Sequence, residues 1–143
     1  MPLPTITTPT YELNLPSTGK KIKYRPFLVK EEKILILALE SRDQNEITNS
    51  VKDVLKKCVI TRGIKIDDLP TFDIEYLFLN IRAKSIGEDI NLVVTCPDDR
   101  KTEVEVTVYV DEIEVVKSKE HNKDISLDKD LTLRMKYPSL NQL

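Results

Sequence analysis

Apolar and polar residues alternate near the start of the chain in a way that predicts a β-hairpin. The apolar positions of this pattern are Tyr11, Leu13, Leu15, Ile22 and Tyr24. Between the two runs, the segment "PSTG" brings Pro16 and Gly19, which are residues that favour a turn. Residues 1–10 precede this hairpin and hold three prolines and four threonines. Each proline fixes φ and removes a donor, so we expect residues 1–10 to form an extended arm.

Two helices are predicted after Pro26. In residues 29–41, the apolar run "ILILAL" is compatible with a helix or a buried strand, but the surrounding Lys, Glu, Leu and Ala residues favour the helix. Asp43 is a candidate N-cap for the second helix. The apolar residues of that helix fall at the spacing of one helical face and are Ile47, Val51, Val54, Leu55 and Cys58.

The corner before the first of these helices is predicted at Arg25 and Pro26, because the residue before a proline is biased away from helical geometry. We expect helix 29–41 to pack its apolar run against the third helix. In that arrangement Leu37 and Leu79 lie in the core, and replacing either with Ala costs about 2–5 kcal/mol.

The third predicted helix covers residues 71–87, with Thr71 as a possible cap and Gly87 as its end. Its apolar residues surround nearly the whole circumference, which is typical of a helix enclosed by its own domain or by a partner. One stripe consists of Ile74, Leu77, Phe78 and Ile81. The other consists of Phe72, Tyr76 and Leu79, and we predict that it binds a partner, because aromatic side chains with a polar tip are enriched at interfaces. The alternative is that both stripes are internal.

From Ile90 onward the hydrophobic period changes from helical to two. The segments "INLVVTC" and "TEVEVTVYV" are predicted strands, and the second alternates so strictly that we expect one buried and one wet face. "CPDDRK" between them is a predicted hairpin loop, and residues 125–138 are predicted to form a further strand or hairpin. The order of an N-terminal β-hairpin, three helices and an antiparallel β-meander predicts a single α+β domain over residues 11–143.

Charge and length restrict the classes of partner. The chain of 143 residues holds 22 basic and 24 acidic residues, with the two signs interleaved along the sequence as a whole. This balance disfavours nucleic acid and an anionic membrane surface as partners. The longest apolar run, residues 34–39, is far shorter than the ~20 residues that a spanning helix needs. We therefore expect a soluble intracellular protein that binds neither nucleic acid nor a membrane.

Residue types that commonly carry chemistry have simpler interpretations here. Cys58 falls on an apolar helix face and Cys96 is isolated, so both are expected to be reduced thiols. His121 lies in a run of charged residues and is interpreted as a solvated loop histidine. The aspartate pairs at 67–68 and 98–99 occur where turns favour aspartate.

The stretch "TCPDD" resembles half of a zinc-ribbon knuckle, but Asp99 stands where the second thiolate belongs. A structural zinc site needs four ligands, so we interpret this stretch as a turn without metal. A phosphate-binding G-x-x-x-x-G-K pattern does not occur in the sequence, which holds three glycines in all. Together these features predict a protein that is not an enzyme and has no catalytic residues, cofactor or metal site.

Four segments carry a resemblance to a known family. They are "TPTYELNLPSTGKKIKYRPFLVKEEKILILALES", "NSVKDVLKKCV", "VTCPDDRKTEVEVTVYVDEIEV" and "LRMKYPSL". Together they resemble the T4-type phage baseplate hub subunits of contractile-tailed phages, and the most specific part runs from Leu15 to Ala38. Members of that family tend to continue beyond the "KYPS" stretch, whereas this chain stops five residues after Pro138. We therefore expect a short relative or a fragment.

The resemblance implies a non-enzymatic structural or assembly component of the baseplate hub, located in the host cytoplasm during assembly and in the tail baseplate if retained. Implied partners are other hub or tail proteins, with the tape-measure protein and further copies of this chain as candidates. The alternative is a transient tail assembly chaperone that shields tape-measure or hub proteins and is absent from the mature virion. A small regulatory or nucleic-acid-associated module is a third hypothesis, disfavoured because the sequence predicts no basic face.

Overall fold

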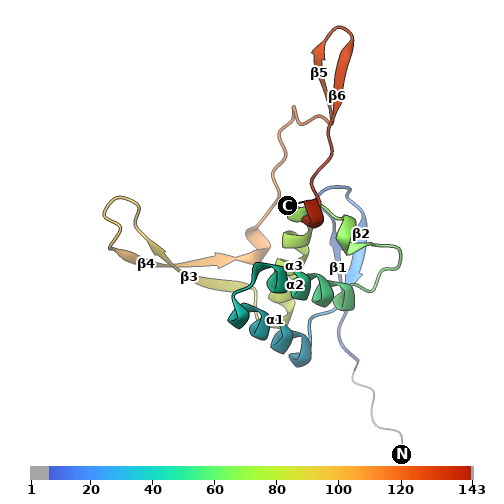
Figure 1. Cartoon of the computed structure of the whole chain (residues 1–143). Coiled ribbons are helices and arrows are strands. Elements are labelled where there is room, and N and C mark those ends of the chain that lie inside the picture. The colour runs from blue at the N-terminus through green and yellow to red at the C-terminus, as the bar shows by residue number, and fades with distance from the viewer. Residues whose placement is uncertain (1–6, 143) are drawn as a thin grey trace, which may run out of the picture.

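The computed structural model describes residues 7–142 and has the predicted α+β architecture (Figure 1). The strands are β1 (Tyr11–Asn14), β2 (Lys21–Tyr24), β3 (Asp89–Thr95), β4 (Glu103–Tyr109), β5 (Asp124–Asp128) and β6 (Leu131–Arg134). The helices are α1 (Val29–Ser41), α2 (Gln44–Cys58) and α3 (Thr71–Ser85), with short 3₁₀ helices η1 (Ile66–Asp68), η2 (Val110–Glu112) and η3 (Leu140–Gln142). Most of the predicted N-terminal arm, residues 1–6, lies outside the described residues, and residues 7–10 have no regular secondary structure.

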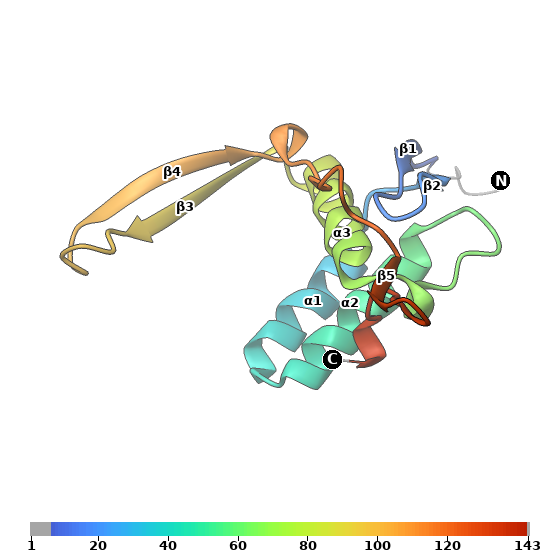
Figure 2. The ribbon, with the colours of Figure 1, turned by 90° about the horizontal axis from the view of Figure 1, so that it is seen from above.

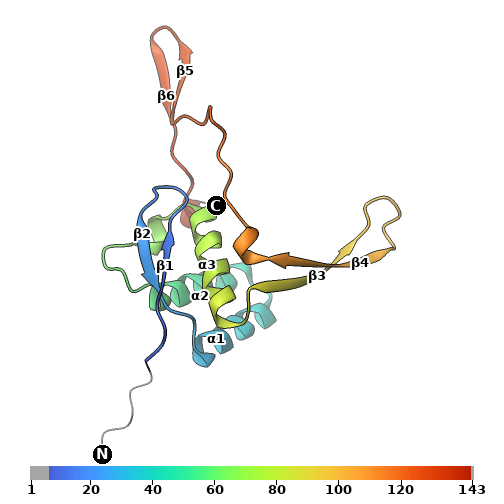
Figure 3. The same cartoon turned by 180° about the vertical axis from the view of Figure 1, so that it is seen from behind.

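One hydrophobic core joins the β1–β2 hairpin to α2 and α3. In the hairpin, Tyr11 pairs with Tyr24 and Leu13 with Ile22, so the alternating apolar residues share one face. The core residues from these elements and their connections are Leu15, Ile22, Tyr24, Phe27, Val54, Leu55, Cys58, Ile66, Ile74, Leu77 and Ile81. Figure 3 shows the hairpin lying beside α3, while α2 crosses behind α3 and reaches the end of β2, where Val59 pairs with Tyr24.

A buried carboxylate fastens the hairpin turn to the start of α3. Asp73 is fully buried and accepts hydrogen bonds from the backbone N–H of Ser17, at 2.9 Å, and from the Ser17 hydroxyl. Asp73 is therefore a structural anchor for the turn. Within the turn, Gly19 has a φ of 70°, which residues with a side chain rarely adopt, and its N–H donates to the carbonyl of Leu15 at 2.7 Å.

The corner at Arg25 and Pro26 is held by a second buried carboxylate. Glu31 is fully buried, accepts a hydrogen bond from the Leu28 N–H at 2.7 Å, and lies 3.2 Å from Nη2 of Arg25. Burial raises the pKa of Glu31, but the hydrogen bonds from Leu28 and Arg25 outweigh it and hold this pKa below its ordinary value. The Leu28 N–H is one of the free donors at the start of α1, so Glu31 also caps the helix.

Helix α1 packs mainly on α2, and the prediction that it packs on the third helix is wrong. Only Arg42 and Asp43 connect α1 to α2, and a connection this short makes consecutive helices antiparallel neighbours. Asp43 caps α2 as predicted, accepting from the Asn45 N–H at 2.8 Å. Leu37, expected in the core, is 55% exposed and lines an open groove between α1 and α2.

The C-terminal strands form two separate two-stranded ribbons, β3–β4 and β5–β6, that project from the core in different directions (Figures 1 and 2). The predicted burial of one face of residues 102–110 is correct only at the base of the ribbon, where Val110, the first residue of η2, is buried next to α3. Further out, Val104 and Val106 are exposed, because no second layer of the described chain covers the ribbon. The chain then returns to the body, where Leu140 packs against the core and Ser139 pairs with Pro70.

Candidate protein-protein interaction surfaces

The two predicted stripes of α3 differ in burial. Ile74, Leu77 and Ile81 lie in the core, and Phe78 packs against it. Phe72, Tyr76 and Leu79, the predicted partner-binding stripe, are half-buried. The Phe72 ring already meets Tyr137 of the same chain edge-on, with the ring centroids 4.9 Å apart. The Phe72 ring is therefore already in contact with another aromatic ring of the same chain.

The β3–β4 ribbon has one entirely apolar face. Its cross-strand pairs are Ile90 with Val108, Leu92 with Val106, and Val94 with Val104, and directly opposite residues share a face. Leu92 is 47% exposed and Val106 is 40% exposed. The reverse face pairs Asn91 with Thr107, whose hydroxyl donates to Oδ1 of Asn91 at 2.8 Å. The ribbon is thus amphipathic, with its apolar side open.

The β5–β6 ribbon also has exposed apolar residues on one side. Ile125 pairs directly with Leu133, whereas Leu131 is opposite Asp128, beyond a register shift between Ser126 and Asp128. Met135 directly follows β6. All four side chains are exposed. The reverse face carries an ion pair in which Nε of Arg134 donates to Asp124 at 2.8 Å. A second open apolar face therefore lies on a separate ribbon.

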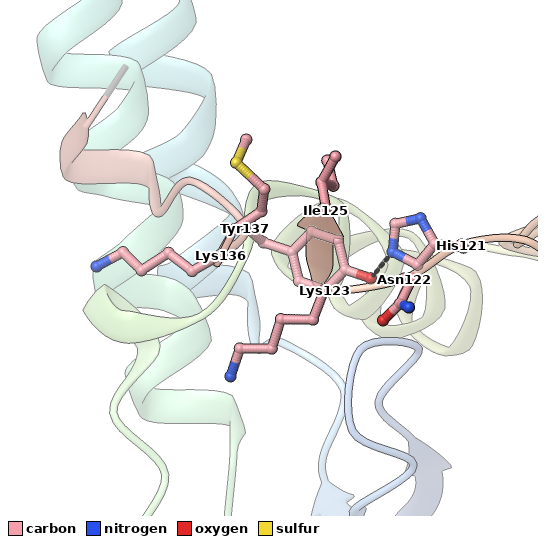
Figure 4. A pocket seen from close by; sticks show the side chains of 7 residues that line it. His121, Asn122, Lys123, Ile125, Lys136 and Tyr137 are labelled. Carbon is pink, nitrogen blue, oxygen red and sulfur yellow. Dashed lines mark hydrogen bonds between the residues drawn. The ribbon is translucent and has the colours of Figure 1, made fainter. Parts of the chain in front are cut away.

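A hollow of about 640 Å³ lies at the base of the β5–β6 ribbon (Figure 4). Its lining residues are His121, Asn122, Lys123, Ile125, Met135, Lys136 and Tyr137. Ile125 and Met135 continue the apolar face of the ribbon into this hollow, and two lysines supply positive charge. Apolar side chains beside two lysines are suited to bind a partner whose surface is apolar and has acidic groups nearby.

His121 lies in this hollow on an exposed loop, in keeping with its interpretation as a loop histidine. Its ring stacks on Tyr137 at a centroid distance of 5.6 Å and an interplanar angle of 2°, and its Nε2 is hydrogen-bonded to the Tyr137 hydroxyl. Tyr137 in turn contacts Phe72. The three rings connect the base of the ribbon to the start of α3.

Helix α1 exposes further apolar side chains. Val29, Ile36, Leu37 and Leu39 are exposed along it. A groove of about 370 Å³ runs between α1 and α2, lined by Ile34, Leu37, Ala38, Glu46, Asn49, Ser50 and Asp53. This groove combines an apolar floor with acidic residues from α2.

The candidate chemical residues have structural roles. Cys58 is fully buried in the core, which confirms the prediction that it is a core residue, and this burial raises the pKa of its thiol to about 11. Asp67 binds Lys56, with the Oδ2 and Nζ atoms 2.8 Å apart. Asp99 accepts from the backbone N–H groups of Lys101 and Thr102, both at 3.0 Å, and from the Thr102 hydroxyl. These hydrogen bonds, that of the hydroxyl above all, lower the pKa of Asp99 to about 2, and they confirm its role in the turn.

Residues 7–142 contain neither a cluster of metal-ligating side chains nor a membrane-spanning helix. In this part of the chain, no group of three or more His, Cys, Asp and Glu side chains is placed to hold a metal ion. None of the helices in the described residues is long and apolar enough to cross a bilayer.

The two open ribbon faces were missed by reasoning from the sequence, although their signal was present. The strict alternation of β4 was recognised, but it was interpreted as a face covered by the chain itself. A second signal would have shown that these faces are open. The three predicted helices cover the β1–β2 hairpin and one another, which leaves none of them to cover the later strands.

Comparison with known proteins places the chain in a family. A model of the family described as T4 bacteriophage base plate protein matches residues 8–143. No curated protein and no solved structure matches the chain. The family match covers nearly the whole sequence and confirms the resemblance at the level of a base plate protein. This protein therefore belongs to the family of T4 bacteriophage base plate proteins.

Proposed function

We propose that this protein is a non-enzymatic structural subunit of the baseplate hub of a contractile tail, and that it acts through contacts with other baseplate or tail proteins. The observation that carries this proposal is the pair of ribbons with open apolar faces. Contiguous exposed apolar surface on a small domain marks sites of protein association. Membership of the family of base plate proteins supports the proposal, because a subunit of a larger assembly needs surfaces that bind its neighbours.

The stability of the ribbons supports the same proposal. An isolated two-stranded hairpin is marginally stable in water, and the outer parts of both ribbons are two-stranded with no covering layer in the described chain. A neighbouring subunit that covers the apolar face supplies the missing layer. The ribbons therefore suit a protein whose working state is an assembly.

Mass spectrometry of purified tails and of isolated assembly intermediates tests the structural role. A hub subunit is present in both, in a constant ratio to other baseplate proteins. Presence in the intermediates alone contradicts the structural role and supports the alternative, a chaperone that shields tape-measure or hub proteins in the host cytoplasm. The same open apolar faces serve either role, so retention in the virion is the distinguishing measurement.

We also propose that the stripe of Phe72, Tyr76 and Leu79 contacts a neighbouring protein, mainly through Tyr76 and Leu79. Tyr76→Glu places a charge on this stripe, and Glu75→Lys is the matched control because Glu75 is exposed on the same helix. We expect Tyr76→Glu to reduce incorporation into tails while the purified chain remains folded by circular dichroism. An unfolded Tyr76→Glu chain, or unchanged incorporation, contradicts a role for this stripe in binding.

A further inference from the structure

The two ribbons of one chain carry opposite charge. Residues 88–114, which contain the β3–β4 ribbon, hold nine acidic and two basic residues. Residues 117–136, which contain the β5–β6 ribbon, hold six basic and four acidic residues. The chain as a whole is nearly neutral, at a formal charge of −2. The expectation that the two signs are interleaved is therefore wrong for residues 88–114, where acidic residues predominate.

The negative charge of the β3–β4 ribbon lies along the strands and at the base. At the tip, Asp98 and Asp99 are balanced by Arg100 and Lys101. Glu103 and Glu105 lie on the reverse face of β4, opposite Thr95 and Val93. Further acidic residues follow at the base of the ribbon, namely Asp111, Glu112 and Glu114. The uncompensated acidic groups thus lie on the reverse face and at the base of the same ribbon, and they give the segment that carries the apolar face a negative charge.

Two of the six basic residues of the β5–β6 segment lie beside its apolar face. Lys123 and Lys136 line the hollow beside Ile125 and Met135. On the reverse face, Arg134 is already paired with Asp124. This side of the β5–β6 ribbon is therefore complementary, in hydrophobicity and in charge, to an apolar surface on an acidic segment.

Figures 1 and 3 show that the two ribbons of one chain project in different directions, so they do not cover each other. We propose that the apolar face of the β3–β4 ribbon of one copy packs on the apolar face and lysine-lined hollow of the β5–β6 ribbon of a second copy. Two ribbons packed in this way form a small sandwich, with each face covering the other.

Charge also decides against the symmetric alternative. Pairing two β3–β4 ribbons through the same face brings two strongly acidic segments within about one Debye length, roughly 8–10 Å, where repulsion is poorly screened. The head-to-tail pairing is attractive instead. Because it uses two different surfaces, a pair of copies retains one free ribbon of each kind, one on each copy, so the contact propagates into a ring or a filament.

The test uses the full chain and two variants that make one face polar without changing net charge. Leu92→Lys with Val106→Glu alters the β3–β4 face, and Ile125→Lys with Leu133→Glu alters the β5–β6 face. Each double substitution places opposite charges on a directly opposite cross-strand pair, which supports the ribbon itself. Asn91→Glu with Thr107→Lys is the matched control on the reverse face of the β3–β4 ribbon.

Sedimentation velocity from about 5 to 500 µM measures association, a range suited to a small interface. We expect the unaltered chain and the reverse-face control to self-associate beyond a dimer, and more weakly at high salt. Each face variant alone is expected to be monomeric. An equimolar mixture of the two face variants forms a heterodimer that grows no further, because each supplies the one ribbon that the other lacks.

Two results overturn the proposal. The first is an unaltered chain that remains monomeric throughout the concentration range. The second is a β5–β6 variant that still associates by itself, which shows symmetric pairing of β3–β4 ribbons. Circular dichroism of each variant at low concentration verifies its fold. Since the measurement uses one purified protein, its outcome does not depend on whether the proposed hub location is correct.

Discussion

The β1–β2 hairpin and the β3–β4 ribbon are built alike but are covered differently. Both are antiparallel pairs with alternating apolar residues facing one another across the strands. In the hairpin, Ile22 is fully buried, whereas in the ribbon Leu92 is 47% exposed. The difference is the presence of α2 and α3 over the hairpin and the lack of any described layer over the ribbon.

This contrast separates two meanings of amphipathic alternation. Alternation indicates that one face of a strand pair is more stable when it is buried, because burial of apolar surface contributes about 25 cal/mol per Å². It does not state which chain provides the cover. In the hairpin the cover is intramolecular and contributes to the stability of the monomer. For the ribbons we propose an intermolecular cover, which contributes to assembly.

The largest expected effect comes from removing a core side chain on the covered side. Leu77 is fully buried in α3 between the hairpin and α2. Leu77→Ala leaves a cavity and is expected to lower the free energy of unfolding by about 2–5 kcal/mol. Urea denaturation of the dilute chain, followed by far-ultraviolet circular dichroism, measures this change. A shift in midpoint no larger than that of an exposed leucine would contradict the placement of this core.

A smaller effect is expected at the anchor between the hairpin turn and α3. Asp73→Ala removes the acceptor of the Ser17 N–H and hydroxyl, which leaves partly buried donors without partners. We expect a loss of about 1–3 kcal/mol in the free energy of unfolding. The same denaturation measurement applies, with Ser17→Ala as the companion variant. If the anchor exists, the two effects are not additive in the double variant, because both remove the same interaction.

The dependence of stability on pH distinguishes a buried carboxylate from an exposed one. The pKa of Glu31 is lower in the folded chain than its ordinary value of 4.5. The stability that this provides is therefore present above pH 4.5 and is lost as the pH falls through the folded pKa. We expect Glu31→Gln to flatten the fall in unfolding midpoint between neutral and acidic pH.

Glu12 provides the control for that experiment. The pKa of Glu12 is also lowered, mainly by its hydrogen bond with Lys21, but the pair is exposed. Salt screens an exposed pair, so any effect of Glu12→Gln disappears at high ionic strength. The effect of Glu31→Gln persists there. Equal salt sensitivity of the two variants would contradict the burial of the ion pair between Arg25 and Glu31.

The smallest effects are expected at exposed leucines. Leu37 on α1 is 55% exposed, and Leu92 lies on the open ribbon face. We expect Leu37→Ala and Leu92→Ala to change the free energy of unfolding of the dilute chain by at most about 0.5 kcal/mol. Leu92→Ala should nevertheless weaken self-association in sedimentation velocity. A large loss of monomer stability in Leu92→Ala would show that the ribbon face is covered within the chain.

Much of the local structure could be predicted from particular residues. The alternation of Tyr11 to Tyr24, the cap at Asp43 and the apolar face ending at Cys58 each produced an element that the structure confirms. The packing of α1 was predicted wrongly, although its short connection to α2 was a usable signal. The anchoring roles of Asp73 and Glu31 could not be predicted, because each depends on partners that the folded chain brings close.

By itself, the sequence determined the order and type of the elements, the amphipathic faces and the separation of charge between residues 88–114 and 117–136. These properties depend on the backbone period and on side chains that are near one another along the chain. Only the tertiary structure decided which faces are covered, because cover depends on contacts between distant segments. Val54 and Val104 have the same side chain, yet one is buried under α3 and the hairpin while the other is exposed on a ribbon.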